Sequence, residues 1–470
     1  MNRDLLRDLG TALAAALLVV TAVLVGTAIE KSDGTLRVNW PPLYARWDPH
    51  VGPGTPAALI VAVAVVAYGP RLAARLRWRA LLGAAWGGAL AWTWSLALVD
   101  GWQRGIAGRL TTKYEYLQVI DRFDDIPGTL RDFTGHILID SPGHWPAHVA
   151  GHPPASTLTF VLLDRAGLGG GAWAGVWCIT VGATACAAVL VAVRALAGER
   201  QARRAAPFLV LSPAAVWMGT SADGYFAAVA AWAVALLSLS VTGQRPRLTA
   251  LGSGLLFGLT CYLSYGLTLF ALLAAAVLLL GRGRAGGGGR RDRPRLLPRA
   301  LCFLAGLSVV PLLFTLAGFD WWEAYRILVE RYHQGAGGIR PYGYWVWANL
   351  ACTVLVVGPV TVAGLRRAVV TLVRRRAELL PRSGGAPSDA PGRALGCAAG
   401  PRLALLVLAA LAALLVADLS GMSKAETERI WLPFALWLLP AGAFLTRPRP
   451  WLAAQAVLAL LVNHLLFTGW

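Results

Sequence analysis

Long apolar runs alternate with short polar segments along almost the whole chain of 470 residues. A helix needs about 20 apolar residues, or about 17 at the shortest, to cross the hydrocarbon core of a bilayer. Several of the runs are short, so the expected number of spans is about thirteen, with roughly 11–13 as the range. The pattern predicts an all-α polytopic membrane protein with spans near 11–29, 56–69, 80–99, 171–193, 206–218, 223–242, 249–264, 266–281, 300–317, 345–364, 403–417, 431–445 and 451–467.

Composition supports this class. Hydrophobic residues make up 57% of the chain and charged residues only 14%, with a mean hydropathy of +0.57. A soluble protein carries about 25% charged residues. The deficit excludes a water-soluble enzyme and a disordered chain.

The net charge of +19 is explained by membrane orientation. With the N-terminus placed in the cytoplasm, the inner segments hold 29 of the 43 Lys and Arg residues but only 6 of the 24 Asp and Glu residues. This asymmetry follows the rule that cytoplasmic loops are rich in Lys and Arg. We therefore expect a multi-pass plasma-membrane protein with a cytoplasmic N-terminus and no nucleic-acid partner.

The same orientation assigns the shorter segments. A crossing by the apolar run 154–166 would put the Arg-rich segment 194–205 outside, so we expect 154–166 to lie as a helix at the outer interface. The Gly-, Pro- and Arg-rich segments 281–295 and 381–396 are typical of linkers. The expected divisions are an N-terminal two-helix hairpin (1–70), a core (71–320) and C-terminal helices (321–470).

Chemistry-capable residues gather in the segments expected outside. Six of the seven histidines and all three lysines lie there, together with most of the acidic residues. The outer segments are 30–55, 100–155, 318–344 and 418–430, and 100–155 is the longest. This concentration indicates an outward-facing site.

An ordered series of features resembles the GT-C superfamily of membrane glycosyltransferases, the polyprenyl-phosphate-sugar-dependent enzymes related to protein mannosyltransferases and aminoarabinose transferases. The series begins with an acidic outer loop and GHPPA at 151–155, followed by the interfacial helix. It continues with LSPAAVWMGTSADGYF from 211 and SGMSKAETERIWLP from 420. The resemblance covers about 71–445, and the preference for Arg over Lys is typical of an actinobacterial-like chain.

The resemblance implies a catalytic Asp in the outer loop, near residues 113–117. Tyr114 stands at the expected Asp position and Glu115 follows it. Either Glu115 acts as the base, or another carboxylate of the loop does, or the chain is inactive. The alternative carboxylates are Asp100, Asp121, Asp124 and Asp125.

A polyprenyl-phosphate donor also requires groups that hold the phosphate and the acceptor. The resemblance implies a phosphate or positioning role for His152 of the GHPPA segment. Four cations of the outer loops are further candidates for phosphate binding: Lys424, Arg429, Arg340 and Arg331. Candidates for the acceptor side are Arg331, His333, Arg340 and Tyr342.

Structural roles compete with several of these assignments. Asp125 followed by Pro127 is typical of a helix start, and Asp223 of a helix N-cap. Glu428 and Arg429 could form a salt bridge at the membrane edge. Asp140, His144, His148 and His152 recur every four residues, but two intervening prolines interrupt a helix there, so no metal site is predicted.

The resemblance implies transfer of a sugar from a polyprenyl-phosphate donor to a cell-envelope glycan, lipid or protein at the outer face. It implies direct displacement with inversion, arabinose or mannose as donor sugars, no required cofactor and an optional divalent metal. One alternative is a transporter or flippase of an envelope substrate, although the spans are nearly free of ionisable residues. The other is an inactive scaffold, which the missing Asp favours.

Overall fold

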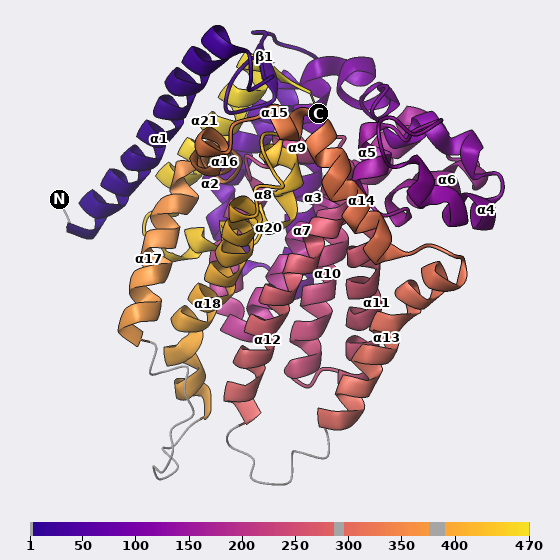
Figure 1. The fold of residues 1–470 in the computed structure, drawn as a ribbon. Helices are drawn as coiled ribbons and strands as arrows, with labels where there is room; N and C mark the ends of the chain where they lie inside the picture. Colours follow the sequence, from indigo (N-terminus) through magenta and orange to yellow (C-terminus); the bar gives the residue numbers. More distant parts are fainter. Residues whose placement is uncertain (1–2, 286–295, 376–390, 470) are drawn as a thin grey trace.

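The computed structural model describes residues 3–285, 296–375 and 391–469 (Figure 1). The predicted linkers 281–295 and 381–396 lie largely outside the described residues. The longer helices are α1 (Arg3–Asp33), α2 (Thr55–Arg75), α3 (Trp78–Ala97), α7 (Gly170–Ala197), α8 (Glu199–Val210), α10 (Ala222–Val241), α11 (Pro246–Leu263), α12 (Phe270–Ala285), α13 (Leu296–Leu316), α14 (Trp321–Gln334), α16 (Tyr342–Val357), α17 (Pro359–Arg375), α18 (Pro391–Leu419) and α21 (Pro448–Leu465).

Short elements connect these helices. The short α-helices are α4 (Ile126–Asp132), α5 (Ala147–Gly151), α6 (Ala155–Arg165), α9 (Ala215–Met218), α15 (Ala336–Ile339), α19 (Thr427–Ile430) and α20 (Leu432–Ala435). Tighter or wider turns form η1 (Leu98–Asp100), η2 (Gln103–Ala107), η3 (Arg109–Thr111), η4 (Tyr116–Phe123), η5 (Phe133–His136), η6 (Tyr265–Leu269) and η9 (Leu439–Phe444). The strands β1 (Ala45–Trp47) and β2 (Leu466–Thr468) pair antiparallel, with Arg46 opposite Phe467.

The all-α polytopic fold is confirmed. Seven helices in the described residues are long and apolar enough to cross a bilayer, or eight if the bent pair α16 and α17 is one span. The remaining runs among the thirteen expected spans fall on helices that are shorter, less apolar or broken. The centre of the bundle is formed by α7 and α10, whose apolar windows are 61% and 72% buried, whereas α13 at the periphery is only 11% buried.

Proline explains why several expected spans are broken. The run 206–218 is divided between α8 and α9, because Pro213 has no amide hydrogen and cannot continue the helix. The run 345–364 bends by 104° between α16 and α17, where Gly358 has a φ of +81° and Pro359 follows. The run 431–445 contains Pro433 and Pro440 and forms only α20 and η9.

Small residues bring neighbouring helices together. Gly254 and Gly258 of α11 are four residues apart and face α13. A Cβ atom on Gly254 would overlap the carbonyl oxygen of Phe303, and one on Gly306 would overlap that of Leu251. The two backbones are therefore in direct contact, which is the packing that small residues allow between helices in a membrane.

The segments predicted to lie outside meet at one end of the bundle (Figure 1). This loop end consists of residues 34–54, 98–169, 317–341 and 420–431. The ends of α12, α13, α17 and α18 that flank the undescribed segments point the opposite way. The predicted interfacial segment forms α6, whose 11 residues span only about 16 Å, too little to cross a bilayer.

The helices predicted as an N-terminal hairpin pack on different parts of the bundle. Helix α1 lies against α16 and α17, whereas α2 lies against α3, α8 and α21. Asp8 of α1 is buried and pairs with Arg366 and Arg367 of α17. The boundaries at 70 and 320 stay predictions.

Candidate functional site

Arg429 is the centre of a buried polar cluster at the loop end. It lies in α19, and its side chain is 7% exposed. Its Nη1 atom donates to Asp223 Oδ2 at 2.9 Å, and its Nη2 atom lies 3.0 Å from Glu426 Oε2 and 2.8 Å from His148 Nε2. Burial alone would lower the pKa of Arg429, but the carboxylates of Asp223, Glu426 and Glu115 raise it above its ordinary value.

Glu115 is joined to this cluster through His148. The Nδ1 atom of His148 lies 2.9 Å from Glu115 Oε1. Glu115 is 5% exposed, and its other oxygen, Oε2, is buried without a hydrogen-bond partner among the described residues. The preceding Tyr114 is 46% exposed, so the side chain at the position expected for the catalytic Asp points to the surface. Glu115 is therefore the carboxylate of this segment that reaches the interior.

Asp223 enters the cluster from the start of α10. The N-cap of α10 is Ser221, whose Oγ atom accepts from the backbone amide of Asp223, so the predicted N-cap role of Asp223 is wrong. Because Ser221 already caps the helix, the Asp223 carboxylate is available to Arg429. Its place in the first turn also suits a negative charge.

A strained loop positions α19. Ala425 and Glu426 have φ values of +69° and +60°, a left-handed conformation that costs a residue with a Cβ atom about 1–2 kcal/mol. Glu426 bridges two cations, because its Oε1 atom lies 3.5 Å from Arg340 Nη1 while Oε2 contacts Arg429. Burial would raise the pKa of Glu426, but Arg429 and Arg340 lower it below the ordinary value. The loop is thus held in its strained form by ion pairs.

A small cavity lies beside these side chains. It has a volume of about 10 Å³ and is lined by Arg109, Leu110, Glu115, Tyr116, His148, Thr220, Ser221, Ala222, Asp223 and Arg429. A cavity of this size holds about one water molecule. A sugar ring therefore enters only if the surrounding segments move.

The charges around the cavity are balanced. Two arginines, Arg109 and Arg429, line it together with two carboxylates, those of Glu115 and Asp223. The adjoining Glu426 pairs with both Arg429 and Arg340. Among the described residues, no group of three or more His, Cys, Asp or Glu side chains could hold a metal ion. The cluster is therefore best described as an arginine held by several acids.

Arg109 connects this cluster to a second polar cluster around Asp100. Its Nη2 atom lies 3.1 Å from Asp100 Oδ2, and its side chain is only 9% exposed. Asp100 also contacts His50 and Arg104, at 3.2 and 3.1 Å. The guanidinium of Arg109 lies 4.6 Å from the ring centroid of Phe467. Asp100 is thus bound by cations and does not line the cavity, whereas Arg109, which sequence reasoning missed, does.

His152 lies behind the cavity wall. Its Nδ1 atom donates to the backbone oxygen of His148 at 2.8 Å and lies 3.2 Å from the hydroxyl of Tyr116. Burial lowers the pKa of His152 to about 4. His152 contacts the residues that form the cavity but does not line it.

Most of the other predicted binding residues donate hydrogen bonds to backbone oxygens of neighbouring loops. Arg340 donates to the backbone oxygens of Leu36 and Lys424, at 3.0 and 2.8 Å. Lys424 Nζ donates to Gly337 O at 2.9 Å. Arg331 donates to backbone oxygens of Ile137 and Trp145, Tyr342 donates to Leu419 O, and His333 is exposed.

The remaining acidic candidates lie elsewhere. Asp125 is the N-cap of α4 and accepts from the Gly128 amide at 3.1 Å, so the helix-start interpretation is confirmed. Asp121 and Asp124 are exposed. None of the three lines the cavity. Glu428 accepts from the Tyr44 amide and from Cys352 rather than pairing with its neighbour Arg429.

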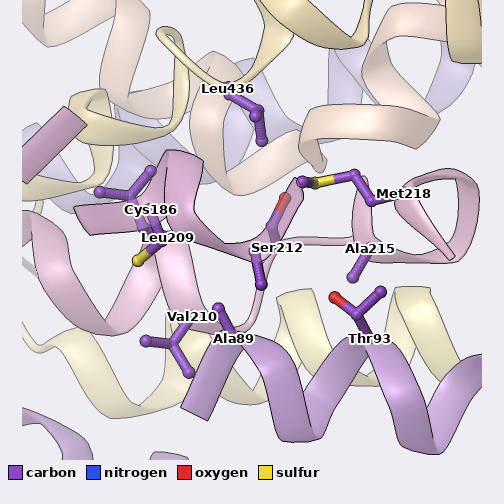
Figure 2. Close-up of a pocket in the computed structure, with 10 residues that line it drawn as sticks. Ala89, Thr93, Cys186, Leu209, Val210, Ser212, Ala215, Met218 and Leu436 are labelled. Carbon is purple, nitrogen blue, oxygen red and sulfur yellow. The ribbon is translucent and has the colours of Figure 1, made fainter. Parts of the chain in front are cut away.

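A second small cavity lies deeper in the bundle, where α8 breaks (Figure 2). Its volume is about 20 Å³, and its lining is mostly apolar, with Thr93, Cys186 and Ser212 as the polar residues. Figure 2 shows Leu436 and Met218 on one side of this space and Ala89 and Thr93 of α3 on the other. Its lining contains no charged group.

No protein-family model and no curated relative matches the chain. A solved structure that is similar is the oligosaccharyltransferase of Archaeoglobus fulgidus, determined with zinc and sulfate, at a TM-score of 0.39 and 15% sequence identity. The match covers 76% of this chain and 53% of the other, so the chain spans about half the length of that protein. A TM-score below 0.5 does not establish a common fold, so function is inferred from the residues of this chain.

Proposed function

We propose that this chain is an integral membrane glycosyltransferase that uses a polyprenyl-phosphate sugar, with Glu115 as its general base. The observation that carries the proposal is the buried Oε2 atom of Glu115. It has no hydrogen-bond partner among the described residues, while Oε1 is held by His148 and the residue lines the cavity beside Arg429. A carboxylate whose one oxygen is held by a hydrogen bond and whose other oxygen has no partner is suited to act as a base that receives a proton.

The proposed reaction is a single displacement. The acceptor hydroxyl oxygen attacks the anomeric carbon and loses its proton to Glu115 Oε2. The bond between the anomeric carbon and the phosphate oxygen breaks on the opposite side, and its electron pair leaves with the polyprenyl phosphate. One displacement of this kind inverts the anomeric configuration.

Two arginines would stabilise the phosphate that leaves. Arg429 and Arg109 both line the cavity, and a guanidinium can bind a phosphate through two parallel hydrogen bonds. The ion pairs of Arg429 with Asp223 and Glu426 must then be partly exchanged for phosphate oxygens. The two carboxylates would hold the guanidinium in place before the donor binds.

Entry of a sugar requires the loop end to open. The cavity of about 10 Å³ excludes a sugar ring, and the strained residues Ala425 and Glu426 lie directly before Arg429. Movement of segment 420–431 would relieve that strain and release Arg429 toward the donor. Such a movement would be part of each catalytic cycle.

The placement of the cluster favours an enzyme over a transporter. Its buried charges lie at the loop end, whereas transporters bind their substrates near the middle of the bilayer. With the loop end outside, as the distribution of Arg and Lys predicts, the acceptor would be a glycan, lipid or protein of the cell envelope.

The test is transfer of radiolabel by the purified protein in lipid nanodiscs. A panel of polyprenyl-phosphate pentoses and hexoses would be supplied with a crude envelope acceptor. We expect transfer from at least one donor, its loss in Glu115→Gln and its retention in Glu330→Gln, an exposed glutamate of the loop end. Absence of transfer from every donor by folded wild-type protein would contradict the proposal.

A further inference from the structure

A basic groove lies between the ends of α2 and α21, apart from the cluster at Glu115. Its volume is about 420 Å³, far larger than that of the two small cavities described above. It is lined by Pro70, Arg71, Ala74, Arg75, Arg447, Pro448, Arg449 and Pro450. All four arginines are exposed. The groove therefore combines a concave wall with a high positive charge.

The charge of the groove is not neutralised within the part of the chain that the structure describes. Arg71, Arg75 and Arg447 have no carboxylate partner there. The neighbouring Arg203 of α8, by contrast, pairs with Glu199 at 2.6 Å. Arg449 donates to the backbone oxygen of Ala67 at 3.0 Å and thereby ties α21 to α2. Three cations of a preformed groove are thus available to a negative ligand.

The groove lies about one helix length from the loop end. Helix α21 continues into β2, which pairs with β1 at the loop end, so its first residues lie at the other end of the bundle. Its 18 residues correspond to about 27 Å, close to the thickness of the hydrocarbon core of a bilayer. The groove therefore lies at the depth of lipid headgroups when the loop end faces the opposite surface.

We propose that this groove binds the phosphodiester headgroup of an anionic membrane phospholipid. The three available arginines supply the positive charge, the alanine and proline residues contact the glycerol and upper acyl carbons, and the adjoining face of α2 is open to lipid. The exposed apolar residues Leu59, Ile60, Val63 and Leu72 of α2 would contact the acyl chains. Basic pockets between membrane helices are known to select such headgroups.

The chain contains a matched control for the charge alone. Arg245-Pro246-Arg247 starts α11 as Arg447-Pro448-Arg449 starts α21, and both first arginines are left-handed, with φ values of +46° and +55°. Arg245, Arg247 and the nearby Arg299 do not line the groove. The variants R71Q/R75Q/R447Q and R245Q/R247Q/R299Q therefore remove equal charge inside and outside the groove.

The experiment is native mass spectrometry of the full chain in detergent with added phosphatidylglycerol, cardiolipin or phosphatidylcholine. We expect the wild type and R245Q/R247Q/R299Q to retain the anionic lipids, and R71Q/R75Q/R447Q to bind them about tenfold more weakly. The proposal would be overturned if both variants lost the lipids equally, or if the wild type retained phosphatidylcholine as well as the anionic lipids. It would also be overturned if inorganic phosphate at about 10 mM displaced the lipid completely. If the triple groove variant does not fold, R71Q/R75Q is compared with R245Q/R247Q in the same way.

Discussion

Arg429 Nη2 lies 2.8 Å from His148 Nε2, and this contact determines the tautomer of the histidine. A guanidinium only donates hydrogen bonds, so Nε2 of His148 must accept. The ring proton of His148 therefore lies on Nδ1, where it is donated to Glu115 Oε1 at 2.9 Å. Arg429 thereby orients the proposed base through a side chain that itself takes no part in the reaction.

His148 is consequently predicted to be a positioning residue. We expect His148→Leu to lower kcat about a hundredfold, because a displaced base loses its alignment with the acceptor. The KM for the donor should change little. His148→Gln keeps one donor and one acceptor and should recover part of the rate. An equal loss in both variants, or a loss confined to KM, would contradict this role.

The ion pair of Arg429 with Asp223 should dominate the stability of the loop end. Arg429→Gln leaves the buried carboxylate of Asp223 without its arginine partner and Glu426 with Arg340 alone, which we expect to lower the free energy of unfolding by about 3–5 kcal/mol. Adding Asp223→Asn should restore part of this loss, since fewer charges remain unpaired. Chemical denaturation in detergent measures both variants. Strict additivity of the two substitutions would show that the pair is not coupled.

An exposed ion pair provides the control for that experiment. Arg46 and Asp48 are 3.4 Å apart, with side chains 57% and 31% exposed. Because surface pairs contribute little, Arg46→Gln should change the free energy of unfolding by at most about 1 kcal/mol.

His152 should make stability depend on pH in the acidic range. Its pKa is about 4 in the folded protein, against an ordinary value of 6.5. Between these values the unfolded chain binds more protons, so stability rises with pH and is lost as the pH falls from 6.5 toward 4. The thermal midpoint should follow this slope. His152→Asn should flatten it, whereas His144→Asn, at an exposed position, should leave it unchanged.

The strain before α19 can be measured by paired substitutions. Ala425 and Ala348 are both buried in the same small apolar cluster, but only Ala425 has a positive φ. Ala425→Gly removes a buried methyl group worth about 0.8 kcal/mol and relieves strain of about 1–2 kcal/mol. Ala348→Gly, inside helix α16, should destabilise by about 2 kcal/mol. Equal destabilisation in the two variants would show that no strain is stored at Ala425.

The positions of the membrane helices were predictable where the pattern of apolar runs alone determines them. Apolar runs locate helices such as α1, α7 and α10 because a helix in lipid must satisfy its own backbone groups. Breaks such as that at Pro213 were less predictable, since prolines in membrane helices cause a kink in some contexts and a break in others. The expected number of continuous spans was therefore higher than the number of long helices in the structure.

The site was predictable only in part for a different reason. Glu115, Arg429 and Arg340 carry recognisable chemistry in loops, and the structure brings all three into one connected cluster. Arg109 and Glu426 were missed, and Asp223 was assigned to a cap, because their roles depend on contacts across the fold. Arg429 and Asp223 are 206 positions apart in sequence, and no local pattern relates them.

The most direct test of the central claim is the turnover rate of Glu115→Gln at saturating donor. We predict a kcat about 10²–10⁴-fold below that of the wild type, with an unchanged KM for the donor, because only the proton acceptor is lost. Glu330→Gln should retain the wild-type rate. A kcat for Glu115→Gln within a factor of about two of the control would contradict the assignment of Glu115 as the base.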